Sequence, residues 1–171
     1  MINENTQKLL NSQINKEFFS AYLYLGFANW FGDLGLNGFA NWYTIQAQEE
    51  RDHALLFLEY MQNNGLNIDL EAIEKPVQSF EKSRDILVEG LNHEKFVTDS
   101  IHTIYEAALE NKDYRTTQFL DWFIKEQGEE EKNADDLIRR WDLFAEDSKA
   151  LYMLDNELAQ RVYAAPDLVL S

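Results

Sequence analysis

Apolar side chains recur at helical spacing along four long stretches of the chain and one short stretch. Steps of three and four residues between apolar positions place those side chains on one face of an α-helix. The pattern predicts an all-α protein, with helices over residues 5–33, 37–64, 81–111, 113–143 and 148–160. No change in composition marks a boundary, so we expect residues 1–171 to form a single domain.

The connections between these stretches predict how the helices are arranged. Residues 33–38 and 111–113 are short links, which join antiparallel neighbours. Residues 65–80 are different, because about 16 residues can extend to roughly 50 Å, whereas a helix of about 27 residues is only roughly 40 Å long. A connection of this length allows the second and third helices to run parallel. The sequence therefore predicts a four-helix bundle with one long crossover between helices 2 and 3 and a short fifth helix at the C-terminal end.

Each long apolar stripe is interrupted near its middle by side chains that can bind metal ions. The interruptions are Glu17, Glu50 with His53, Glu94, and Gln127 with Glu130. Because all lie about 12–17 residues from the start of their helices, we expect them in one layer of the bundle. Four ionised carboxylates in a buried layer would carry a charge of −4, and each unpaired one would cost several kcal/mol. Two divalent cations would neutralise that charge, which predicts a dinuclear metal site.

The spacing suggests how two metal ions would be shared. Glu17 and His53 would hold the first ion, Glu94 and Glu130 would hold the second, and Glu50 would bridge them. His53 follows Glu50 by three residues, so both side chains lie on the same side of the helix. Each residue alone has an ordinary explanation, since a helical Glu is usually solvated and a lone His is usually a core residue. The spacing does not choose between iron, manganese and zinc.

Composition narrows the possible functions. A net charge of −16 argues against binding nucleic acid, because that binding depends on clustered Lys and Arg. The chain has no cysteine, which excludes disulfide scaffolds, iron–sulfur clusters and thiolate zinc sites. No apolar run approaches the roughly 20 residues of a membrane span, and the first residues do not form a secretory signal. We therefore expect a cytoplasmic protein with no membrane association.

Five short motifs resemble those of the bacterial non-haem ferritins. They are NKE at 15–17, QEERDH at 48–53, HE at 93–94, FLDWF at 119–123 and EQGEEE at 126–131. The resemblance spans roughly residues 5–155 and implies a ferritin-like four-helix bundle. It also implies a homo-oligomeric hollow shell of twenty-four subunits. Such subunits oxidise Fe(II) with O2 or H2O2 at a di-iron ferroxidase centre and store Fe(III) as an oxide mineral.

The resemblance also implies roles for individual residues. The ferroxidase ligands would be Glu17, Glu50, His53, Glu94 and Glu130, with Gln127 beside the second iron and Tyr24 beside the centre. Tyr24 fits equally well as a core tyrosine whose hydroxyl needs a partner. A third iron site would be built from Glu49, Glu126, Glu129 and Glu130. The alternative for that group is an ordinary acidic helix face.

Two departures from the family pattern remain. Gly128 stands where the family has His, and the tail after about residue 158 does not match, which leaves its position open.

Several functions other than that of a ferritin remain as alternatives. A bacterioferritin would carry Glu-x-x-His on both helices that supply a pair of ligands, whereas the fourth helix of this chain has Gln127-x-x-Glu130. The Met that binds haem in bacterioferritins would fall at Asp52, so no haem is expected. A non-mineralising di-iron oxidase, a DNA-protecting mini-ferritin and a metal-free helical interaction module are further alternatives. The acidic charge opposes the mini-ferritin.

Overall fold

The computed structural model describes residues 2–77 and 79–170, and within them it contains five helices and no strand. The helices are α1 (Glu4–Asp33), α2 (Asn37–Asn63), α3 (Ser83–Glu110), α4 (Tyr114–Phe144) and α5 (Ser148–Leu158). Each end lies within two residues of its predicted position, so the all-α prediction is confirmed. None of the described helices has the length and apolar character that a membrane crossing requires.

Side chains and glycines set the helix ends. Asn3, Asp113 and Asp147 each accept a hydrogen bond from a backbone N–H in the first turn of α1, α4 and α5, respectively. After α1, Gly35 takes the left-handed conformation (φ +77°), and the N–H of Leu36 bonds back to the carbonyl of Phe31 at 2.9 Å. The chain therefore leaves α1 through a compact turn that returns it directly into α2.

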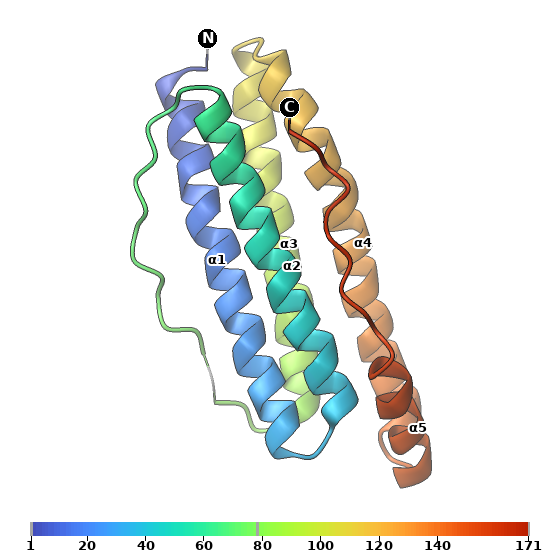
Figure 1. The fold of residues 1–171 in the computed structure, drawn as a ribbon. Helices are drawn as coiled ribbons and strands as arrows, with labels where there is room; N and C mark the ends of the chain where they lie inside the picture. Colours follow the sequence, from blue (N-terminus) through green and yellow to red (C-terminus); the bar gives the residue numbers. More distant parts are fainter. Residues whose placement is uncertain (1, 78, 171) are drawn as a thin grey trace.

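The four long helices form a bundle with one long crossover, as predicted (Figure 1). α1 packs against α2 and α3, and α3 packs against α4. The crossover after α2 runs back along α1, which makes α2 and α3 parallel (Figure 1). Amide side chains on one face of α1 hold it there. Asn11 exchanges two hydrogen bonds with the main chain of Asp69, and Asn15 donates to the carbonyl of Ala72 at 3.1 Å.

The hydrophobic core consists of two clusters. One contains Phe27 and Phe31 of α1 with residues from the start of α2 and the end of α4. The other contains Leu10 of α1 with residues from the end of α2 and the start of α4. On each long helix the interrupting polar residues lie between the segments that join the two clusters. The predicted metal-binding residues thus occupy a buried polar layer near mid-bundle.

α5 folds back to contact α4 and the first turn of α2 (Figure 1). The Asp155 carboxylate accepts hydrogen bonds from the N–H groups of Gly38 at 2.8 Å and Phe39 at 3.0 Å. A negative charge at a helix N-terminus is stabilising there. A side chain at Gly38 would place its Cβ 1.7 Å from the carbonyl oxygen of Asp155, so only glycine fits. From α5 the tail turns back along the bundle, in a position that the sequence left open (Figure 1).

Candidate metal centre

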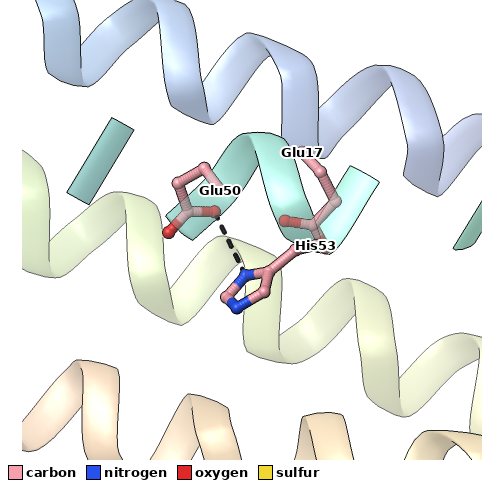
Figure 2. A group of neighbouring side chains, drawn as sticks. All are labelled: Glu17, Glu50 and His53. Carbon is pink, nitrogen blue, oxygen red and sulfur yellow. Dashed lines mark ion pairs between the residues drawn. The ribbon is translucent and has the colours of Figure 1, made fainter. Parts of the chain in front are cut away.

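Five ionisable side chains converge in the polar layer, and all are buried. Ligand atoms of Glu17, Glu50 and His53 lie within 4.8 Å of one another, and so do those of Glu50, Glu94 and Glu130. Figure 2 shows the first group, in which Glu17 of α1 points toward Glu50 and His53 of α2. Glu50 belongs to both groups. The structure therefore places two three-residue groups side by side around the carboxylate that the sequence analysis assigned as the bridge.

Two buried atoms in the first group have no hydrogen-bond partner among the described residues. They are Oε2 of Glu17 and Nδ1 of His53. Nδ1 of His53 lies 3.7 Å from Oε2 of Glu50, which is too long for a hydrogen bond. Such unpaired atoms are rare in folded proteins and cost about 1–3 kcal/mol each. A cation bound between them would satisfy both, and carboxylate with imidazole suits iron, manganese or zinc.

Burial also changes the acidity of the carboxyl groups. Burial, together with a smaller contribution from the nearby Glu50, raises the pKa of Glu17 and of Glu94 to about 8. Burial likewise raises the pKa of Glu50 and of Glu130, and other carboxylates of the layer add to the effect. Without a cation, these groups therefore hold protons near neutral pH. A bound cation favours the charged forms and releases those protons.

Two glutamines that the sequence analysis did not select orient carboxylates of the layer. Nε2 of Gln13 donates to Oε1 of Glu17 at 2.8 Å. Nε2 of Gln46 donates to Oε1 of Glu50 at 3.1 Å and to Oε2 of Glu130 at 2.7 Å. In both cases the glutamine precedes a carboxylate by four residues on the same helix face. This repeated Gln-x-x-x-Glu spacing is the sequence pattern from which these two contacts could have been suspected.

Glu94 has two further partners, both named in the sequence analysis. Nε2 of Gln127 donates to Oε2 of Glu94 at 3.1 Å. The Tyr24 hydroxyl donates to Oε1 of Glu94, and burial raises the pKa of Tyr24 well above its usual range. Tyr24 is therefore a neutral donor. Both side chains lie beside the second group of carboxylates, and the amide nitrogen of Gln127 faces Glu94.

The residues named for a third site are only partly together. Glu126 and Glu130 form a group with His53, with ligand atoms within 4.8 Å of one another. Glu49 instead pairs with Arg161, whose Nη2 lies 2.5 Å from its Oε2. Glu129 is exposed, and its Oε1 lies 3.8 Å from Nζ of Lys125. His53 thus lies where the sequence analysis expected only carboxylates, and the tail contributes a cation that it did not foresee.

The chain is similar to known proteins over most of its length. Residues 7–144 match the family model of the ferritin-like domain. A bacterial non-heme ferritin from Campylobacter jejuni is 36% identical over 155 residues, covering 91% of this chain and 93% of that protein. The chain belongs to the ferritin family.

Other ferritins extend the similarity. A bacterial non-heme ferritin from Staphylococcus aureus is 33% identical over 163 residues, covering 95% of this chain and 98% of that protein. The crystal structure of an open-pore ferritin from the archaeon Archaeoglobus fulgidus superimposes with a TM-score of 0.92 at 40% identity, over 95% of this chain and 100% of that one. The family resemblance and the ferritin-like bundle predicted from the sequence are confirmed.

Proposed function

We propose that this ferritin stores iron, and that each subunit oxidises Fe(II) at the buried dinuclear layer before Fe(III) is deposited as an oxide mineral. Membership of the ferritin family supports iron storage in general. The observation that carries the finer proposal is the pair of ligand groups sharing Glu50, with unpaired atoms on Glu17 and His53. We further propose one ferritin-like domain per chain and a cytoplasmic homo-oligomeric shell of twenty-four subunits.

In this proposal the two iron ions are substrates, and the protein places them side by side. Glu17 and His53 hold the first, Glu94 and Glu130 hold the second, and Glu50 bridges them. The charge of four carboxylates is balanced by two Fe(II) ions. Each Fe(II) gives up one electron; O2 takes two electrons and two protons to form H2O2, or H2O2 takes the same to form two waters. Two iron ions held about 3.5–4 Å apart, as in other two-metal sites, would supply both electrons to one oxidant.

Oxidation changes the charge balance of the layer. Two Fe(III) ions exceed the four carboxylates by two positive charges, which favours loss of protons from iron-bound water. In the assignment proposed here the first iron has an imidazole ligand, whereas the group around the second, Glu50, Glu94 and Glu130, contains carboxylates alone. We therefore propose that Fe(III) leaves toward the group of His53, Glu126 and Glu130, with Glu49 and Glu129 farther out. A non-mineralising di-iron oxidase is the alternative, and it would keep its two metal ions after turnover.

Iron loading tests the proposal. Several hundred Fe(II) ions per shell are added in air, and size-exclusion chromatography follows iron and protein together. Soluble Fe(III) far above two ions per chain, eluting with a large assembly, is the expected result. About two per chain or fewer would contradict storage. Glu50→Gln should abolish rapid loading, whereas Glu59→Gln, an exposed position on the same helix, serves as the matched control.

A further inference from the structure

The C-terminal segment 159–170, here called the strap, lies against α2 and α4 (Figure 1). Its contacts extend along its length. The Tyr163 hydroxyl donates to Asp52 of α2, and Nε1 of Trp122 of α4 donates to Oδ1 of Asp167 at 2.6 Å. Leu168 and Leu170 pack against the core cluster that contains Leu10. The strap therefore contacts both α2 and α4. These helices carry Glu49, Glu126 and Glu129, here called the outer carboxylates.

Arg161 is the most extensively bonded residue of the strap. Its Nη2 lies 2.5 Å from Oε2 of Glu49, and both side chains are largely buried, at 17% and 18% exposure. Nη1 donates to Oε1 of Gln46 at 3.1 Å and to the carbonyl of Trp42 at 3.2 Å. The guanidinium carbon lies 4.1 Å from the centre of the Trp42 ring. An arginine bonded on its edge and stacked on its face is held in one position.

Glu49, the partner of this guanidinium, lines a cavity that could receive a metal ion. The cavity measures about 300 Å3, and its walls include Glu49, Glu126 and Glu129. Strap residues 164–167 line it as well. Because the Arg161 guanidinium donates a charge-assisted hydrogen bond to Oε2 of Glu49, a metal ion must displace the guanidinium to bind this oxygen. The strap thus controls how many carboxylate oxygens the cavity offers.

The same side chain is connected to the buried layer. Oε1 of Gln46 accepts from Arg161, so the amide nitrogen of Gln46 must face inward. That nitrogen donates to Glu50 and Glu130, which belong to the second ligand group. Displacement of Arg161 would free Glu49 and also loosen the amide that orients these two carboxylates. The strap therefore links the state of the outer cavity to the inner ligands.

We propose that the strap is a built-in competitor for metal: the Arg161 guanidinium holds Oε2 of Glu49, and a metal ion in the cavity between α2 and α4 gains this oxygen only by displacing Arg161. This inference rests on the proposed function in one respect, namely that metal ions pass through this cavity. A metal ion entering the cavity thus has to overcome an ion pair as well as shed its own water. Removal of the arginine charge should strengthen binding there and leave the number of inner sites unchanged.

Zn(II) is the probe, because it does not change oxidation state and accepts carboxylate and imidazole ligands. Calorimetry on the assembled protein counts the ions bound per chain, and the cavity ion is recognised as the one lost in Glu126→Gln. Arg161→Gln should bind that ion roughly tenfold more tightly, since a largely buried competing charge has been removed. Arg161→Met, which keeps an unbranched chain over Trp42, should bind the cavity ion about as tightly as Arg161→Gln does. Arg140→Gln, which removes an exposed pair with Glu157, is the control.

A double-mutant cycle shows whether the effect acts through Glu49. In a Glu49→Gln background, Arg161→Gln should give no gain in affinity for the cavity ion. An equal gain in both backgrounds, or no gain in either, would overturn the strap proposal. Failure of the wild-type protein to bind two inner Zn(II) ions would instead count against the proposed function. Arg161→Lys, which keeps the charge, should stay close to wild type, and thermal melting verifies that each variant is folded.

Discussion

Glu49 and Glu50 are neighbours in the chain, yet they belong to two different environments. Glu50 points into the buried layer, where its exposure is 1% and an amide of Gln46 orients it. Glu49 faces the strap and pairs with Arg161. An amide orients a carboxylate and leaves its charge intact, whereas a guanidinium neutralises that charge. The inner carboxyls, which hold protons near neutral pH without a cation, become charged when a metal ion binds, whereas the charge of Glu49 is already neutralised by Arg161.

The largest expected difference between variants of Glu50 and Glu49 is in the initial rate of Fe(II) oxidation. Glu50→Gln removes the carboxylate shared by both ligand groups, so the initial rate should fall on the order of 100-fold or more. Glu49→Gln should change the initial rate only a few-fold, because Glu49 does not belong to the inner groups. Stopped-flow absorbance of Fe(III) compares the two variants. Equal losses in both would break the distinction between inner and outer carboxylates.

The buried carboxyls should also make the metal-free protein less stable as pH rises. Their folded pKa is raised to about 8 for Glu17 and Glu94 from a usual value of 4.5. Between these values the folded state holds protons that the unfolded chain has released, so stability is full below about pH 4.5 and falls by at most about 1.4 kcal/mol per pH unit per group. The loss levels off above about pH 8.

Thermal unfolding of the metal-free protein between pH 5 and 9 measures this effect. Saturating Zn(II) should flatten the profile, because the cation favours the charged carboxylates. Glu17→Gln should also reduce the slope, since it removes one of the titrating groups. Glu129→Gln, at an exposed carboxylate of the outer face, should leave the slope unchanged. A metal-free protein that gains stability toward pH 8 would contradict the assignment of these pKa shifts to buried groups.

A smaller effect is expected from replacing Gln46, whose amide contacts Glu50 in the inner layer and Arg161 of the strap. Gln46→Met removes the donor to Glu50 and Glu130, and we expect Zn(II) affinity of the inner layer to fall roughly tenfold, as for other partners of metal ligands. Gln62→Met, at an exposed position on the same helix, is the matched control. Calorimetric titration measures both. An unchanged affinity would mean that the ligand carboxylates are oriented without this amide.

The smallest effect concerns the helix that carries Glu129 and Glu130. Gly128 is exposed, and a Cβ there would meet nothing within 4 Å. Gly128→Ala should therefore raise the free energy of unfolding by about 1 kcal/mol, through helix propensity alone. Denaturant unfolding measures the gain. A loss of stability would indicate that this turn needs the freedom of glycine.

Most residues of the candidate site could be predicted from helical periodicity. The residues that could not be predicted are those whose contacts depend on more than the pattern within one helix. Glu17, Glu50, His53, Glu94 and Glu130 interrupt apolar stripes, so the pattern of each helix already directed them inward. Gln13 and Gln46 lie on the same faces, four residues before Glu17 and Glu50, but this spacing alone does not establish that the amide bonds the carboxylate. Arg161 lies beyond the last helix, where no period constrains it. Its partner Glu49 is 112 residues away in the chain, and such a pairing leaves no local signal.

The sequence by itself determined the five helices, the single crossover and the layer of buried carboxylates, because each depends on side-chain spacing within one helix or on the length of one connection. Only the tertiary structure decided which amide meets which carboxylate, that His53 lies beside Glu126, and that the strap covers the outer face. Those features depend on the rotation of α2 relative to α4 and on the path of a segment without periodic structure. Both arise from packing across the whole bundle, which no local pattern encodes.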